Sequence, residues 1–107
     1  MTTTWKKTER TIAKRLNGRR TGATGRATAD VVSERFAVEV KHRQQLPEWL
    51  KEALAQAVAA ADPTQLPIVV LHEAGRRHDG DLVLMRLADF EQTILQTTCA
   101  PKTNLLE

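Results

Sequence analysis

The spacing of apolar residues near the start of the chain predicts an amphipathic helix over residues 4–17. Three apolar side chains recur at helical spacing and would share one face of this helix: Trp5, Ile12 and Leu16. Thr3 or Thr4 is suited to cap the first turn, because its hydroxyl can accept a hydrogen bond from a backbone amide. Asn17-Gly18 supplies a stop signal, so we expect the helix to end there.

The next two apolar stretches, residues 28–33 and 36–42, predict a pair of β-strands. A loop rich in Gly, Thr and Arg, from Arg19 to Arg26, precedes them, and a tight turn near Ser33-Glu34-Arg35 would join them. The second stretch has a clean two-residue period. Phe36, Val38 and Val40 would point to one face, and Ala37, Glu39 and Lys41 to the other.

The second half of the chain predicts a helix, two strands and a closing helix. Pro47 marks the start of the second helix of the chain, which runs to about Ala61 and ends at Asp62-Pro63. Its apolar face comprises Leu50, Ala53, Leu54, Ala57, Val58 and Ala61. The run from Ile68 to Leu71 is apolar throughout, as in a central strand that is covered on both faces. A strand over Leu82–Arg86 and a helix from Leu87 to about Leu95 follow.

This order, α-β-β-α-β-β-α, predicts an α/β domain with a central mixed sheet flanked by helices. We expect a single domain over residues 1–96 and a flexible C-terminal tail over residues 97–107. The helix over residues 47–61 would then be a right-handed crossover between neighbouring strands.

Composition narrows the classes of protein that the chain can belong to. Its length of 107 residues suits one domain, and no apolar run is long enough to span a membrane. The N-terminus lacks the apolar segment of a signal peptide, and a single cysteine, Cys99, cannot form an internal disulfide. We therefore expect a cytoplasmic protein without membrane contact.

Charge is distributed unevenly between the two parts of the chain. Residues 1–43 contain 11 Lys and Arg but only 4 Asp and Glu, a net charge of +7, whereas the whole chain carries +3. A basic segment suits a polyanion such as DNA, because cations beside phosphates release condensed counterions. A soluble surface with uneven charge is the alternative interpretation.

Four residues form a candidate catalytic cluster: Glu9, Asp30, Glu39 and Lys41. Glu9 falls inside the apolar stripe of the first helix, where a carboxylate needs a cation or hydrogen bonds to stay charged. Glu39 and Lys41 would project from one face of a strand, where we expect residues to pack. Asp30 would lie on the partner strand, within reach of Glu39.

These residue types suit Mg²⁺, which prefers oxygen ligands and keeps some of its waters. Asp30, Glu39 and the Val40 carbonyl are candidate ligands, and Glu9 could bind directly or through a water. Lys41 would orient the attacking water or neutralise charge on the phosphate. Each residue also has an ordinary explanation: Glu-X-Lys as a surface salt bridge, Glu9 at the edge of the stripe, and Asp30 in a turn.

The order Glu9, Asp30, then Glu39-Val40-Lys41 resembles the PD-(D/E)XK nuclease superfamily, and more narrowly its small archaeal and phage Holliday-junction resolvases. The loop Thr21–Gly25 stands where that family has a small-residue loop before its aspartate, whereas Ala29 replaces the proline of many relatives. The resemblance implies a restriction-endonuclease-like fold, dependence on Mg²⁺ or Mn²⁺, and a homodimer that cuts branched DNA.

Several other residues are candidates for DNA contact. Arg19, Arg20 and Arg26 flank the glycine loop, while Arg10 and Lys14 lie on the polar side of the first helix, where a merely solvated face is the alternative. Thr21 belongs to the same loop. Gln56 on the second helix is a candidate to support the metal site. The pattern His72-Glu73 with His78 has the wrong spacing for a helical zinc protease site, and Gly75 argues against a helix there.

The sequence leaves four functions open. The first is a Mg²⁺-dependent endonuclease that is selective for branched DNA. The second is a nuclease of the same fold that acts on nicked, flapped or linear DNA. The third is a non-catalytic DNA-binding module that uses the basic N-terminal half, and the fourth is a phage or plasmid accessory protein that binds only protein partners.

Overall fold

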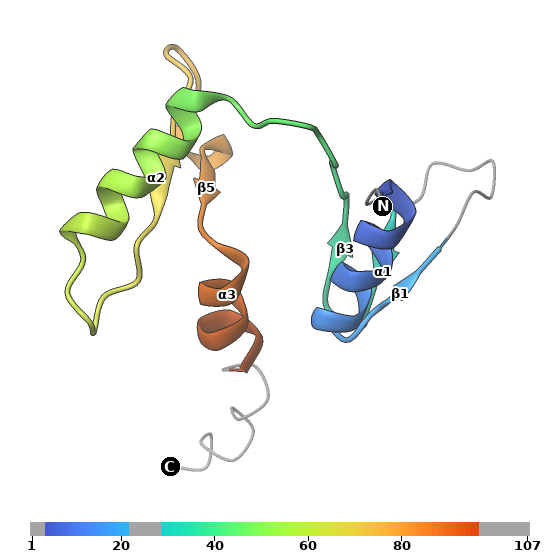
Figure 1. The fold of residues 1–107 in the computed structure, drawn as a ribbon. Helices are drawn as coiled ribbons and strands as arrows, with labels where there is room; N and C mark the ends of the chain where they lie inside the picture. The colour runs from blue at the N-terminus through green and yellow to red at the C-terminus, as the bar shows by residue number, and fades with distance from the viewer. Residues whose placement is uncertain (1–3, 22–28, 97–107) are drawn as a thin grey trace. The chain divides into compact units, whose positions relative to one another are not determined.

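The computed structural model describes residues 4–21 and 29–96, which form a mixed α/β structure (Figure 1). The expected α/β class is therefore confirmed. The chain divides into two compact units, Met1–Gln44 and Gln45–Glu107, and each is described here by itself. Thr3, Arg26, most of the glycine loop and the tail over residues 97–107 lie outside the described residues.

The first helix, α1, spans Trp5–Arg15, close to its expected bounds. Thr4 caps it, because its hydroxyl Oγ1 accepts a hydrogen bond of 3.1 Å from the Lys7 amide. Lys14 and Arg15 occupy the last turn, where positive charge interacts favourably with the carboxyl end of a helix. Local sequence signals thus specify both ends of this helix.

The helix stops through a pair of backbone hydrogen bonds that require a left-handed residue. The Gly18 amide donates to the Ala13 carbonyl at 2.8 Å and the Asn17 amide to the Lys14 carbonyl at 3.4 Å, the arrangement of a Schellman motif. Asn17 supplies the left-handed conformation with a φ of 59°. Asparagine tolerates this conformation better than most residues, so Asn17 turns the chain and Gly18 follows it.

A three-stranded antiparallel sheet follows α1, in the order β1-β2-β3. Its strands are β1 (Arg19–Arg20), β2 (Val31–Val32) and β3 (Ala37–Val38). The expected hairpin of β2 and β3 is confirmed, with Val31 opposite Val38. The Ser33 hydroxyl accepts hydrogen bonds from two amides of the turn, those of Arg35 and Phe36. Arg19 and Arg20, which were expected in a loop, instead form the edge strand.

The core of the first unit is small and lies between α1 and β2. Its buried apolar residues are Ala13, Leu16 and Val31, and the Val31 side chain is completely buried. Glu9 is the buried charged residue of this core. The expected stripe is wrong at its first position, because 52% of Trp5 is exposed.

The second unit begins with α2, which spans Glu48–Ala60 and directly follows Pro47 at its amino end. The expected apolar face is confirmed in outline, since Leu50, Ala53, Leu54, Ala57 and Val58 are the half-buried residues of the helix. None of its residues is fully buried. The helix contacts strand β4 (Val69–Leu71), which follows the buried Pro67.

Within residues 4–21 and 29–96, strand β4 pairs only with β5 (Leu82–Leu84), in an antiparallel two-stranded sheet. The prediction of a central strand covered on both faces is therefore wrong for the described residues. Val70 is 56% exposed and Ile68 41% exposed. Strands β3 and β4 also belong to different sheets, so α2 is not a crossover within one sheet, and the described strands do not form the expected central mixed sheet.

The closing helix is confirmed over almost the expected range. Helix α3 (Leu87–Phe90) continues directly into η2 (Glu91–Leu95), which has the wider turn of a π-helix. Arg86 precedes α3, and its Nε donates to the Asp89 carboxylate at 2.8 Å. Among the described residues, no helix has both the length and the apolar character needed to cross a membrane.

A carboxylate organises the turn that follows α2. Asp62 Oδ1 accepts hydrogen bonds from the Thr64 hydroxyl at 2.7 Å and from the Thr64 amide at 2.8 Å. These bonds stabilise the charged carboxylate, and together they lower the pKa of Asp62 below its ordinary value. The turn is therefore supported above the ordinary aspartate pKa of about 3.9 and loses this support as the pH falls through the lower folded value.

Replacing the hydroxyl donor provides a test of this turn. We expect Thr64→Ala to raise the pKa of Asp62 toward its ordinary value, because the largest of the hydrogen-bond contributions comes from the Thr64 side chain. The carboxyl chemical shift of Asp62, followed by NMR between about pH 2 and pH 6, measures the change. Identical titration midpoints in the two proteins would contradict this assignment.

Candidate active site

Glu9 is held on the inner face of α1 by an arginine from the neighbouring strand. Arg20 Nε lies 2.7 Å from Glu9 Oε1, and the two side chains are 25% and 9% exposed, respectively. The guanidinium also lies 5.8 Å from the ring centre of Trp5, within the range of a cation–π contact. The sequence indicated that Glu9 needs a cation, and Arg20 provides it.

Asp30 is tied to the middle of the Glu39-Val40-Lys41 segment. Its Oδ2 accepts a hydrogen bond of 2.7 Å from the Val40 amide, and Asp30 itself is half-buried. Continuing the β2–β3 register by one residue pair also places Asp30 opposite Glu39. Residues directly opposite each other in an antiparallel pair have neighbouring side chains on the same face. The expected proximity of Asp30 to this segment is therefore confirmed.

Glu39 and Lys41 lie at the surface and pair with each other. The Lys41 Nζ is 3.1 Å from Glu39 Oε2, and these side chains are 64% and 57% exposed. The alternation expected along the strand is confirmed, because Phe36, Val38 and Val40 are the more buried set. However, the expectation that Glu39 and Lys41 project from a packed face is wrong, since their face of the first unit is open to solvent.

A contact that sequence reasoning missed joins α1 to the same segment. The Thr8 hydroxyl lies 2.7 Å from His42 Nδ1, and these residues are the immediate neighbours of Glu9 and Lys41. Together with the hydrogen bond between Asp30 and Val40, this contact brings the backbone around Glu9, Asp30 and Glu39 into one region. A histidine three residues after a glutamate gives no sequence signal for such a contact.

The three candidate carboxylates lie in one region but do not form a preassembled metal cage. In the described part of the chain, no set of carboxylate oxygens, one from each of Glu9, Asp30 and Glu39, lies within 4.8 Å of one another. Glu9 already pairs with Arg20, and Glu39 with Lys41. A cation shared by Asp30 and Glu39 would therefore require the exposed Glu39 side chain to turn away from Lys41.

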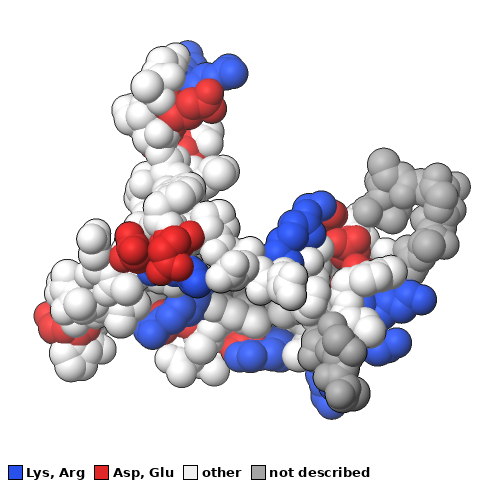
Figure 2. Space-filling model, turned by 45° about the horizontal axis from the view of Figure 1, so that its top comes forward, with Lys and Arg blue, Asp and Glu red and all other residues white. Residues whose placement is uncertain are grey.

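The candidate DNA-contacting residues differ in their surroundings. Arg10, Lys14 and Arg19 are exposed, whereas Arg20 is engaged by Glu9. The Thr21 hydroxyl donates to the Ala29 carbonyl at 2.7 Å, so it links the residue after β1 to the residue before Asp30. Figure 2 shows Lys and Arg side chains at the surface, several of them beside acidic ones. Gln56 is exposed on α2 in the second unit, and its expected role stays a prediction.

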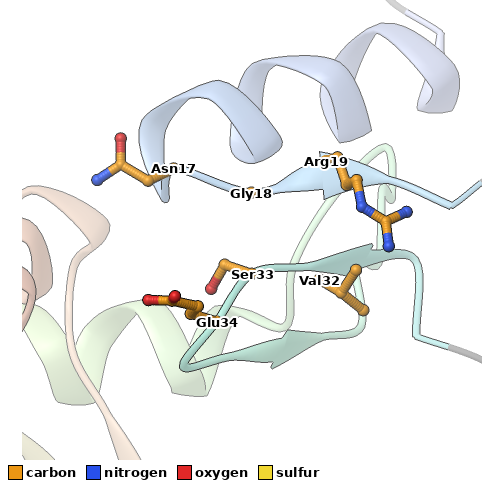
Figure 3. Close-up of a pocket in the computed structure, with 6 residues that line it drawn as sticks. All are labelled: Asn17, Gly18, Arg19, Val32, Ser33 and Glu34. Carbon is orange, nitrogen blue, oxygen red and sulfur yellow. The ribbon is translucent and has the colours of Figure 1, made fainter.

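A shallow pocket lies between the end of α1 and the β2–β3 turn (Figure 3). Its lining residues come from both segments: Asn17, Gly18, Arg19, Val32, Ser33 and Glu34. None of the four predicted catalytic residues lines it. Gly18 passes close to β2, and a Cβ atom built on Gly18 would lie 2.6 Å from the Val32 carbonyl oxygen. The absence of a side chain at Gly18 therefore lets the helix exit pack closely against the sheet beside this pocket.

Comparison of the chain with protein-family models, with curated proteins and with solved structures finds no match.

Proposed function

We propose that this chain is a divalent-metal-dependent DNA endonuclease of restriction-endonuclease-like fold, with its site in the first unit. The observation that carries this proposal is the hydrogen bond from the Val40 amide to Asp30 Oδ2, because it fixes an aspartate against a Glu-X-Lys segment. The same order of residues underlies the resemblance to PD-(D/E)XK nucleases. Glu9, Asp30, Glu39 and Lys41 are the proposed catalytic residues.

The donor set around Asp30 fits Mg²⁺ or Mn²⁺. Asp30 and Glu39 offer carboxylate oxygens, and the Val40 carbonyl is a third oxygen donor from the same segment. The open surface at Glu39 leaves room for waters and for phosphate oxygens, which Mg²⁺ ordinarily keeps among its ligands. Bound there, the metal ion supplies Lewis-acid polarisation of the scissile phosphate.

Lys41 and Glu9 have separate parts in this proposal. When Glu39 turns toward Asp30, Lys41 loses its partner and becomes available to neutralise charge that develops on the phosphate. Glu9 is buried against Arg20, so its ionised state is already compensated before DNA binds. A phosphate near Arg20 would compete with Glu9 for the guanidinium and release the carboxylate toward the site.

The proposed substrate is branched duplex DNA, and the proposed assembly is a homodimer in the cytoplasm. The first unit carries the excess of positive charge, and its exposed arginines and lysines suit a phosphate backbone. Paired sites related by a two-fold axis would match the two-fold symmetry of a four-way junction. Recognition of the branch itself rests on the resemblance to junction resolvases.

Cleavage by matched variants tests the proposal. We expect the wild-type chain to cut a four-way junction with Mg²⁺ or Mn²⁺, and Glu39→Gln and Asp30→Asn each to reduce the rate at least about a hundredfold. Glu39→Gln is the cleaner variant, because the side chain is 57% exposed and should be replaceable without unfolding. Junction, flap, nicked and linear substrates in parallel measure the structural preference.

DNA-binding measurements on the same variants distinguish a catalytic role of these carboxylates from a role in DNA binding alone. Both variants should still bind DNA, because removing a carboxylate lessens repulsion by phosphate. Equal cleavage by the variants and the wild type would exclude the proposed site, and loss of folding in Glu39→Gln would contradict its surface position.

A non-catalytic DNA-binding module is the second candidate. The observation in its favour is that Glu9 and Glu39 each pair with a cation of the chain itself, Arg20 and Lys41, which is an arrangement that also suits a structural role. Binding of the junction by the wild type without cleavage, under Mg²⁺ and Mn²⁺ alike, would favour this candidate.

A further inference from the structure

Two histidines and an aspartate meet at one end of the β4–β5 ribbon. In the antiparallel register, Leu71 lies opposite Leu82, so the next residue pair places His72 opposite Asp81. Side chains of directly opposite residues lie close together, and His72 Nδ1 is 2.6 Å from Asp81 Oδ1. Strand pairing itself therefore positions the first two members of this cluster.

A short 3₁₀ helix brings in the third member. The segment η1 spans His78–Gly80, and the Asp81 amide donates to the His78 carbonyl at 2.9 Å. Residues three apart eclipse each other in a 3₁₀ turn, so His78 comes to lie over Asp81. Its Nδ1 is 2.9 Å from Asp81 Oδ2, and the two imidazole rings stack with their centres 4.2 Å apart.

We propose that His72, His78 and Asp81 form a binding site for a transition-metal ion of the Zn²⁺ class. Each residue offers a ligand atom, and the three atoms all lie within 4.8 Å of one another. Two ligands of a tetrahedral zinc ion with bonds of about 2.1 Å lie roughly 3.4 Å apart. The present separations at Asp81 are slightly shorter, so a small outward rotation of the histidines would admit the ion.

The donor chemistry selects this class of metal over the Mg²⁺ of the proposed nuclease site. Two imidazole nitrogens and one carboxylate suit Zn²⁺, Co²⁺ or Ni²⁺, whereas Mg²⁺ prefers oxygen ligands alone. Three protein ligands leave a fourth position for water or for a group from another molecule. The Asp81 side chain is only 14% exposed and would anchor the ion, while the His78 side chain, 80% exposed, leaves it accessible from solvent.

Helical spacing, the usual sequence test for a histidine pair, fails to find this site. His72 and His78 would not share a face of a helix, and Gly75 with a φ of 87° turns the chain between them. The cluster depends instead on strand register and on a single 3₁₀ turn. The chain has three histidines, and the third, His42, contacts Thr8 in the first unit, so it provides a matched control.

Metal titration of the full-length, tag-free chain tests the site. After removal of bound metal with a chelator, we expect one equivalent of Co²⁺ to give the visible absorption of a tetrahedral site, and Zn²⁺ to displace it. His78→Ala, His72→Ala and Asp81→Asn should each weaken Zn²⁺ binding at least about tenfold, because each removes a direct ligand. His42→Ala should bind as the wild type does.

A folding control shows whether a loss of Zn²⁺ binding comes from loss of a ligand or from loss of structure. His78→Ala removes a mostly exposed side chain, so its circular dichroism should match that of the wild type. Undiminished Zn²⁺ binding by folded His78→Ala, or no stoichiometric binding by the wild type, would overturn the proposal. Neither measurement depends on DNA cleavage, so the metal site is tested independently of the proposed nuclease activity.

Discussion

Lys41→Met is expected to reduce DNA cleavage by about 10²–10³-fold while leaving the fold unchanged. A cation that neutralises charge developing on the phosphate acts mainly in the transition state, so its loss lowers the rate more than the affinity for DNA. Methionine keeps most of the length of the lysine side chain and removes its charge. The measurement is the single-turnover cleavage rate at saturating four-way junction with Mg²⁺.

Stability should respond little to the same substitution. The Lys41 side chain is 64% exposed, and its ion pair with Glu39 is a surface pair, which contributes no more than about 1 kcal/mol. Lys51→Met provides the matched control, because Lys51 pairs with Glu48 at 3.3 Å on α2 and is likewise exposed. Both variants should unfold like the wild type, and only Lys41→Met should lose activity. Equal cleavage rates for Lys41→Met and Lys51→Met would show that Lys41 has no catalytic role.

Elements specified by local signals were predicted well. Thr4 and Asn17 delimit α1 through hydrogen bonds within a few residues, and Pro47 marks the start of α2. The hairpin is equally local, because Ser33 closes its turn and the alternation around Val38 sets its faces. In each case the physical cause lies within one turn or one strand pair, where a sequence pattern can reveal it.

Elements that depend on distant partners were predicted poorly. Strand β1 consists of two arginines, so it has no apolar alternation, and only its pairing with Val31 and Val32 makes it a strand. The apolar run at Val70 indicated burial on both faces, yet β4 has a single strand partner in the described part of the chain and Val70 remains more than half exposed. Burial depends on what covers a strand, which a single run of residues does not encode.

The candidate site shows the same division. The position of Glu9 within the helical stripe showed that a carboxylate would need a partner, but the choice of Arg20 depends on the β1–β2 pairing. The hairpin register brought Asp30 near Glu39, whereas the hydrogen bond to the Val40 amide depends on how the chain leaves β3. The pattern therefore predicted that Asp30 lies beside the Glu39-Val40-Lys41 segment, but not the hydrogen bond that joins them or the partner of Glu9.

Gly18→Ala is expected to destabilise the first unit by about 2–3 kcal/mol, because the added methyl group would overlap backbone that cannot retreat. A Cβ atom there would lie 2.6 Å from the Val32 carbonyl oxygen and 3.1 Å from the Val32 carbonyl carbon. Strand β2 is the middle strand of its sheet, so moving Val32 would disturb its pairing with both β1 and β3. The fully buried Val31 adjoins the same position.

Each unit has its own tryptophan, which allows the effect to be localised by urea denaturation. Trp5 fluorescence in a Trp49→Phe background reports on the first unit, and Trp49 fluorescence in a Trp5→Phe background reports on the second. Gly80→Ala is the matched control, since a Cβ atom at Gly80 meets nothing within 4 Å and should change stability by less than about 0.5 kcal/mol. An equally small effect at Gly18 would mean that α1 does not pack this closely on β2. Because that packing holds the exit of α1 against the sheet, it also helps to keep Glu9 beside Arg20.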